Sequence, residues 1–572
     1  MRSKSTLTKS QWCLLFLLPI AACSAATSKV IYVDNDATSA NDGSSWENAY
    51  LYLQDALADA NFAEKPIEIR VAQGIYKPDQ GAIQTPGSRE ATFRLINDVT
   101  LEGGYAGLDE PDPDARNVEL YETIMSGDLN GDDVEVTEPC DLRNVPTRAE
   151  NSYNVVTGSG TDDSAVLDGF TITAGNANQP YTSGWLPDPT GPDNDAWRFT
   201  RGAGMFNIFA SPIVANCTFT MNSGSVGGGM FNYLCVMTLN DCKFARNSAR
   251  WGGGMSDSQS SLTLTNCHFS ENLANFGGGL SGGSRTIKLT DCTLIRNSAD
   301  RSGGGMFDES ITTLTNCAFI ANEADQAGGL SSQFSTLTDC TFIANKARNW
   351  GGGMWSGLGD TVSNCIFSGN SASICGGAIY LTIFTDIIIT NCTLTGNSAP
   401  NGNALASDSF FGDPNYPSNI ELMNCIVWGG GNEIWNDGVS KIKISYSDIK
   451  NGQAGIYDPY GVIVWGQDNI DVDPLFADTG HWVDVNDPNV IVEPNNPDAL
   501  WINGEYHLKS EAGRWNPNSE SWVIDDVTSP CIDTGDPLTP VMYEPHPRGC
   551  FINMGAFGGT EKASKSPVNP PY

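Results

Sequence analysis

The feature that most constrains this chain is a repeat of about 25 residues, marked by nine cysteines. The first four intervals between them are 25 residues each, and the later ones are 23, 25, 27 and 33 residues. A near-constant period of this size is typical of a solenoid, in which each repeat is one coil stacked on the previous one. The nine are Cys217, Cys242, Cys267, Cys292, Cys317, Cys340, Cys365, Cys392 and Cys425.

Other positions keep step with these cysteines. An aliphatic residue lies three positions before each cysteine, and asparagine or aspartate lies directly before it. In the first eight repeats phenylalanine or leucine follows two positions after the cysteine, and asparagine follows five positions after it. The asparagines are Asn222, Asn247, Asn272, Asn297, Asn322, Asn345, Asn370 and Asn397.

This pattern predicts an all-β fold, a right-handed parallel β-helix. Cysteine and phenylalanine two residues apart share one face of a strand. The residue before the cysteine marks a bend, because asparagine and aspartate tolerate left-handed backbone angles. The later asparagine fits a second bend, with amides that bond from coil to coil in a structural ladder. Glycine runs such as Gly252–Met255 complete each coil, since glycine permits close backbone approach.

Sixteen cysteines would suit a disulfide framework, but their regular spacing favours a column of small buried apolar side chains. No paired CxxC motif supports zinc, and His268 has no regular histidine partner. Cys531 and Cys550 lie outside the repeat, and their pairing stays open between a bridge and free thiols.

The N-terminus has the features of an export signal. Basic residues precede the apolar run 12–20, which is too short for a resident membrane helix. Residues 20–23 resemble a lipobox, which would make Cys23 the lipidated N-terminus, and cleavage after Ala26 is the alternative. We therefore expect a signal at 1–26, followed by an N-terminal strand–helix cap and first coils at 27–98. The β-helix is expected at 99–430. C-terminal coils and an irregular capping region should follow at 431–560, with a disordered tail at 561–572.

The composition limits the partners. With 31 basic and 67 acidic residues the formal net charge is −36, which disfavours nucleic acid and polyanionic sugars. No later apolar stretch predicts a transmembrane span. We expect a chain at the cell outer membrane or surface, held by a lipid anchor, or secreted.

The repeated Gly-Gly-(Ala/Leu/Met) and Phe-x-x-Asn tetrapeptides resemble the passenger repeats of chlamydial polymorphic outer membrane proteins over about residues 200–400. Phe219–Asn222 and Phe269–Asn272 are examples. That resemblance implies surface exposure and adhesion. Nothing after residue 430 resembles the strands of that family's membrane barrel. Segments 473–476, 529–533 and 554–557 resemble choice-of-anchor β-helix surface proteins.

The function expected from these observations is a non-catalytic cell-surface or extracellular protein that contacts a glycan or another surface ligand. The alternative is a polysaccharide-active enzyme, a pectate-lyase-like protein or a glycoside hydrolase, because β-helices carry both activities. The acidic pairs of the chain do not recur on one face, so we assign no catalytic residue.

One segment predicts a cation site, and one loop could contact sugar. Asp128, Asn130 and Asp132 place oxygens at alternate positions, as at the start of a calcium-binding loop, although the bidentate glutamate is missing. A solvated acidic turn is the alternative, and Ca²⁺ is the only cofactor that the sequence suggests. A loop at 176–198 carries Trp185 and Trp197 and leaves the solenoid.

Overall fold

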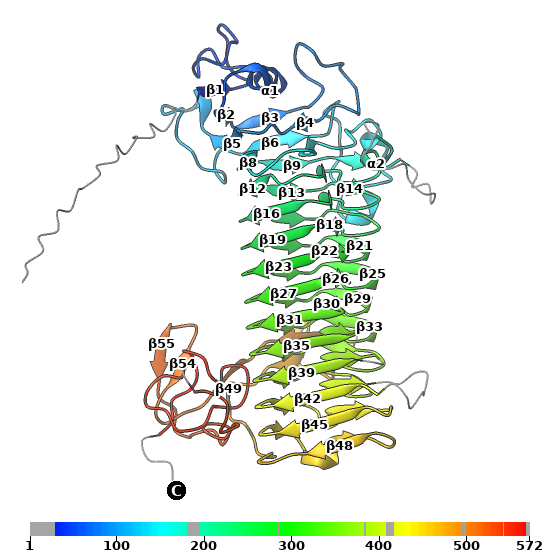
Figure 1. Ribbon diagram of the computed structural model, residues 1–572, viewed down its shortest axis with the longest axis vertical. Helices are drawn as coiled ribbons and strands as arrows, with labels where there is room; N and C mark the ends of the chain where they lie inside the picture. Colours follow the sequence, from blue (N-terminus) through cyan, green and yellow to red (C-terminus); the bar gives the residue numbers. More distant parts are fainter. Residues whose placement is uncertain are drawn as a thin grey trace, which may run out of the picture.

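The chain folds as a right-handed parallel β-helix, seen in a computed structural model (Figure 1). The structure describes residues 29–567 except 180–194, 284, 383–384, 408–416, 495, 497 and 542. Three long parallel sheets form the walls of the solenoid, with 15, 13 and 13 strands. We call them the first, second and third sheets; a smaller parallel sheet of five strands lies at one corner.

One coil illustrates how the repeat folds. Strand β19 (Ser261–Thr265) lies in the first sheet, β20 (His268–Ser270) in the second, β21 (Leu273–Phe276) in the small corner sheet, and β22 (Leu280–Gly283) in the third. The first sheet runs from β1 (Lys29–Val33) to β48 (Val462–Trp465). The second sheet runs from β3 (Gly74–Tyr76) to β46 (Asp448–Ile449). The third sheet runs from β4 (Phe93–Arg94) to β47 (Ile456–Tyr457).

The repeat positions fill the interior as the sequence predicts. The nine cysteines of the repeat are buried and free, which confirms that they are packed apolar side chains. Burial raises the pKa of Cys217 and Cys392, so these thiols stay protonated. Phenylalanines of adjacent coils stack, with ring centroids 4.8 Å apart for Phe219 and Phe244. This spacing is the rise from one coil to the next.

Both bends of the coil use left-handed backbone angles. The residue before every repeat cysteine has positive φ, from 50° at Asn216 to 56° at Asp291 and Asn424, as predicted. The second bend differs from the expectation in one respect. Its left-handed residue precedes the ladder asparagine and includes Arg246 and Glu271, with φ of 55° each. The asparagine side chain compensates for this less favourable conformation by hydrogen bonding into the next coil.

The ladder asparagines form a continuous row of buried amides. Asn247 Nδ2 donates to Asn272 Oδ1 at 3.0 Å and to Phe219 O in the coil above at 2.8 Å. Its Oδ1 accepts from the backbone N and the Nδ2 of Asn222. The same amide-to-amide bond recurs down to Asn397. Each internal amide therefore has all its hydrogen-bonding groups satisfied.

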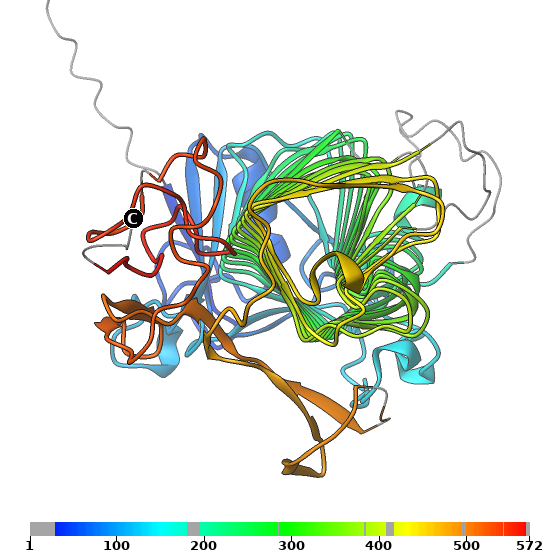
Figure 2. The same cartoon turned by 90° about the horizontal axis from the view of Figure 1, so that it is seen from below.

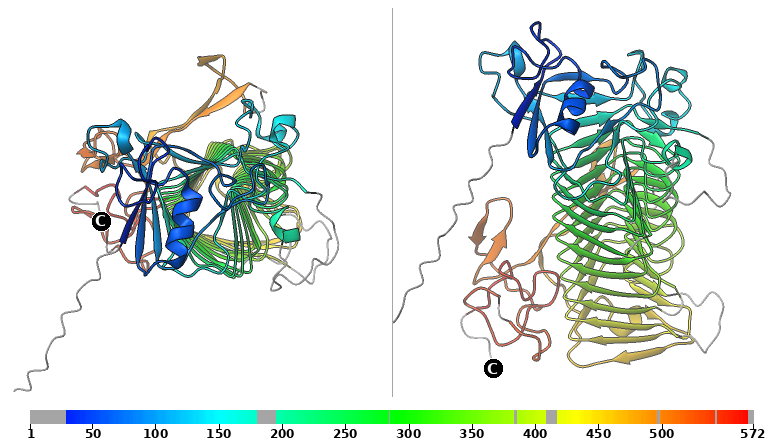
Figure 3. Two further views of the ribbon diagram at one scale, coloured as in Figure 1. Left: turned by 90° about the horizontal axis from the view of Figure 1, so that it is seen from above. Right: turned by 45° about the horizontal axis from the view of Figure 1, so that its top comes forward.

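A strand–helix–strand unit closes the N-terminal end of the solenoid (Figure 3). It consists of β1, helix α1 (Leu53–Phe62) and β2 (Ile67–Ala72). The buried side of α1 includes Leu53, Ala56 and Leu57. The helix thus covers an end at which core side chains and unpaired backbone would otherwise meet water.

The C-terminal region is irregular and packs beside the lower coils (Figure 2). Met554, Tyr506 and Cys531 form a small core there. Cys531 and Cys550 are both free thiols, and Cys531 Sγ lies 3.2 Å from Asp448 Oδ2. The expected disorder of residues 561–572 is wrong for their described part. Ser564 is buried and its hydroxyl donates to Leu508 O, which ties the segment to the body.

Short helical segments complete the fold. The second α-helix, α2 (Asp195–Arg198), is a single turn, and four 3-10 turns lie at Gly107–Asp109, Pro139–Asp141, Pro146–Arg148 and Gly452–Gly455. Of the helices in the described part of the chain, none has the length and apolar character needed to span a bilayer.

Candidate functional site

A large groove lies between the solenoid and an arm of the chain. Figure 2 shows this arm projecting from the side of the solenoid. The arm is an antiparallel sheet of β50 (His481–Asp484), β51 (Asp487–Ile491) and β52 (Ala499–Ile502). Trp482 and Trp501 lie opposite each other on neighbouring strands, with ring centroids 5.2 Å apart. The arm therefore presents a pair of indoles to the lower coils.

Trp501 anchors the arm on two glycines of the solenoid. Gly369 and Gly396 occupy the second bend of successive coils with φ of 61°, and a Cβ on either would lie 2.2 or 2.1 Å from the Trp501 ring. Trp501 Nε1 donates to Ser368 Oγ at 2.9 Å, and Trp482 Nε1 donates to Gly396 O at 3.3 Å. The backbone of these two bends is thus left bare so that the indole can lie on it.

The groove has a volume of about 880 Å³ and combines aromatic and polar walls. Trp482 and Trp501 line the arm side, and Trp428 lines the solenoid side. Lys450 Nζ lies 4.4 Å from the centre of the Trp428 ring, in cation–π geometry. A concave surface with flat rings and few polar groups can bind a ligand that has apolar ring faces and polar edges.

The polar side chains that line this groove include a cation, a carboxylate, an amide and an imidazole. Lys346 and Glu493 are exposed residues of its lining, and Asn403 and His481 add an amide and an imidazole. No convergent carboxylate pair appears among the lining residues the structure describes. The arrangement suits binding by stacking and hydrogen bonding rather than acid–base chemistry.

Both aspartates of the predicted cation segment belong to an acidic cluster that includes one further carboxylate from outside the segment. Asp128 and Asp132 come together with Glu150, and carboxylate oxygens of the three lie within 4.8 Å of one another. Asn130 is exposed and lies between the two aspartates in the sequence. Asp128 Oδ1 also accepts from the Gly131 backbone N–H at 2.6 Å, as in an acidic turn. The donor set suits Ca²⁺, so calcium binding here stays a prediction, with Glu150 as the third ligand.

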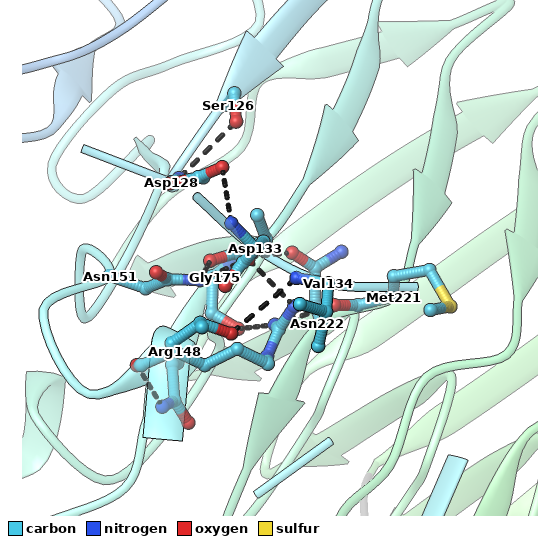
Figure 4. A network of polar contacts seen from close by, with 12 residues as sticks. Ser126, Asp128, Asp133, Val134, Arg148, Asn151, Gly175, Met221 and Asn222 are labelled. Carbon is cyan, nitrogen blue, oxygen red and sulfur yellow. Dashed lines mark hydrogen bonds and ion pairs between the residues drawn. The ribbon is translucent and has the colours of Figure 1, made fainter. Parts of the chain in front are cut away.

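Next to this cluster, a buried ion pair ties the loop to the solenoid (Figure 4). Arg148 Nη1 lies 3.1 Å from Asp133 Oδ2, and Arg148 Nη2 donates to Met221 O at 2.8 Å. Asn151 Nδ2 donates to the same Asp133 oxygen at 2.8 Å. Burial raises the pKa of Asp133, while Asn151 and Arg148 act against that rise. The network lies next to the first ladder asparagine, Asn222, because Arg148 bonds to the preceding residue, Met221. Asn222 Oδ1 accepts from Gly175 N there, so the network has a structural role.

The other residues singled out from the sequence are the ladder asparagines, Cys23 and the two tryptophans of the 176–198 loop. The ladder asparagines are buried at or below 5 % exposure, and the last of them, Asn397, also lines the arm groove. Cys23 and Trp185 lie outside the described residues. Trp197 lies in α2, partly buried, against Phe231 and Tyr233 of the third sheet.

Sequence reasoning missed the arm groove and Glu150. The groove joins Trp428 to Trp482 and Trp501, residues from separate segments, and only the fold shows that they meet. One signal was present in the sequence. Six coils carry a side chain at the second bend, from Met221 to Ala344, and the next two carry glycine. This local change marks where the arm docks.

A family model described as disaggregatase related matches residues 477–535, which include the arm. No curated protein matches the chain. Among solved structures, the pectate lyase Pel9A is similar at 13% identity and a TM-score of 0.32, covering 93% of this chain and 96% of that one. A complex of XylC with xylose is similar at 9% identity and a TM-score of 0.28, covering 87% and 97%. At these scores the likeness carries no argument about function.

Proposed function

We propose that this protein is an exported, non-catalytic surface protein that binds a glycan in the groove between its arm and its solenoid. The observation that carries the proposal is the pair of partly exposed indoles, Trp428 and Trp482, in one groove of about 880 Å³, with Trp501 buried next to Trp482. Sugar rings have apolar C–H faces that stack on indoles and hydroxyl edges that bond to polar groups. A glycan segment of several sugars matches both features.

The charge of the protein narrows the glycan class. The net charge of −36 repels uronate and sulfate polymers, so the ligand is a neutral or amino-sugar polymer. The matched family's description, disaggregatase related, supports a role at a surface where aggregates form or separate. The resemblance to polymorphic outer membrane protein repeats and to choice-of-anchor β-helix proteins supports display at the cell surface. A lipid on Cys23 would provide the attachment.

The binding proposal is tested on a glycan array and by titration calorimetry of the array's positive ligands. Trp482→Ala and Trp428→Ala should each weaken binding at least about tenfold, because stacking on one ring is lost. Trp515→Ala is the matched control, since Trp515 pairs with Trp522 in a separate hairpin and does not line the groove. Equal affinity in all four proteins would contradict the proposal. Cleavage of the bound glycan, seen as new reducing or unsaturated ends, would contradict its non-catalytic part.

Export and anchoring need a separate test. In a lipoprotein-processing host, the full chain should incorporate labelled palmitate and partition into detergent, and Cys23→Ser should abolish both. A mature N-terminus at Thr27 would refute lipidation and leave a freely secreted protein.

A further inference from the structure

A second cavity lies far from the arm, on the outer face of the third sheet. It has a volume of about 250 Å³ and is lined by residues of β15 (Met230–Tyr233), β18 (Met255–Ser258), β22 and β26 (Met306–Asp308). None of its lining residues lines the arm groove. We call it the serine slot, after Ser256 and Ser281 on its floor.

The slot exists because an outward column of aromatic residues is interrupted. In successive coils the paired residues of this column are Phe206, Phe231, Ser256, Ser281, Phe307, Ser331, Trp355 and Tyr380. Two adjacent serines separate Phe231 from Phe307, a gap of three coil steps or about 14 Å. The two rings therefore form opposite ends of a recess whose floor is hydroxyl groups and backbone.

Further aromatic side chains close the sides. Trp197 packs against Phe231 with ring centroids 6.3 Å apart, and Trp251 packs near Phe307 at 6.0 Å. Arg201 is stacked over Trp197, with its Cζ 4.2 Å from the ring centre. The recess thus has flat, rigid walls that are held by contacts within the protein itself.

The floor offers polar groups to a ligand. Ser256 and Ser281 are each 5 % exposed, and within the described part of the chain their hydroxyls make no hydrogen bond. Glu309 reaches the rim, where its backbone N–H donates to Gly282 O at 3.3 Å. Gly283 leaves the mouth free, because a Cβ there would meet a single atom within 4 Å, Asp257 O at 3.9 Å.

We propose that the serine slot binds one neutral pyranose ring. A pyranose would stack its C–H face on an indole wall and hydrogen bond to the two serine hydroxyls and the Glu309 carboxylate. The acid at the rim and the net charge of −36 disfavour a uronic acid. The proposal shares with the proposed function the ligand class, a sugar, and shares no residue with the arm groove. A single ring of this size binds with a Kd on the order of millimolar.

The test fills the slot with phenylalanine, which other coils already carry in this outward column. Ser281→Phe restores the aromatic column between its neighbours and should leave the thermal midpoint unchanged. The matched control is Ser261→Phe on the first sheet, whose outward column carries Phe334 three coils further on. The probes are methyl glucoside, N-acetylglucosamine and galacturonate, observed by saturation-transfer NMR and by chemical-shift titration of the full mature chain.

The expected result is saturation of a neutral sugar in the arm variant Trp482→Ala, in which arm-groove binding is weakened, and in Trp482→Ala/Ser261→Phe, with loss in Trp482→Ala/Ser281→Phe. Galacturonate should bind at least about tenfold more weakly. Equal saturation in Trp482→Ala and Trp482→Ala/Ser281→Phe, or no saturation in Trp482→Ala, overturns the slot proposal. If saturation occurs in the wild type and in Ser281→Phe but is absent from Trp482→Ala, the slot proposal fails and the arm-groove function stands.

Discussion

Replacing one internal ladder asparagine tests what holds the coils in register. Asn297 is 1 % exposed and makes four side-chain hydrogen bonds. Its Nδ2 donates to Phe269 O at 2.9 Å and to Asn322 Oδ1 at 3.1 Å. Its Oδ1 accepts from Asn272 N at 3.1 Å and from Asn272 Nδ2 at 2.9 Å. Asn297→Ala removes all four.

The loss of unfolding free energy in Asn297→Ala depends on which buried groups lose their hydrogen-bond partners. Asn322 Oδ1 keeps the bond from the Asn297 backbone N–H, so it stays satisfied. The backbone N–H of Asn272 and one hydrogen of its Nδ2 are left without an acceptor in a dry interior. A buried donor left unpaired costs about 1–3 kcal/mol, and a satisfied bond contributes about 1 kcal/mol net. We therefore expect a loss of roughly 4 kcal/mol in unfolding free energy.

Denaturant unfolding followed by tryptophan fluorescence measures this loss as a shift in midpoint. Arg296→Ala is the matched control, because Ala321 and Ala344 occupy the same bend in other coils. It should change stability by less than about 0.5 kcal/mol. Asn397→Ala should cost less than Asn297→Ala, since Asn397 ends the row and makes three such bonds. A loss below about 1 kcal/mol for Asn297→Ala would refute the argument that the ladder amides hold the coils together.

Three further predictions concern the arm, pH and calcium. Gly369→Ala should displace Trp501 and make the arm a protease-sensitive segment while the solenoid resists, and unchanged proteolysis would contradict the docking described above. Burial raises the pKa of Asp257 to about 7, above its unfolded value, so its contribution to stability is full below about pH 4 and is lost as pH rises towards 7. The wild type should therefore lose about 2–3 kcal/mol between pH 5 and 8 through this group, and Asp257→Asn should flatten that part of the profile measured by thermal melts. Calorimetric Ca²⁺ titration should show a site that Glu150→Gln removes and Asn130→Ala retains, and the reverse pattern would favour the ligands suggested by the sequence alone.

The repeat made most of the fold predictable because its information is local and recurs. Cysteine and phenylalanine two residues apart define an inward strand face, and the residue before the cysteine adopts the left-handed bend that its type suggests. The second bend was less predictable, since Arg246 and Glu271 adopt left-handed angles that their own preferences oppose. The hydrogen bonds of the following asparagine stabilise that bend, and they exist only after the coils have stacked.

The binding surfaces were harder to predict because they depend on departures from the repeat. The interior positions of each coil are used to pack against the next coil, so ligand recognition falls to outward positions. Two of the changes of pattern there create sites: glycine replaces side chains at 369 and 396, and two successive serines replace aromatic rings at 256 and 281. The first change admits Trp501 and builds the arm groove, and the second opens the slot on the third sheet. Each change leaves the coil's backbone pairing intact, because it alters only an outward side chain or a bend. A solenoid can therefore gain a site by one or two substitutions without loss of core stability, and the outward columns are where further sites on this chain should be sought.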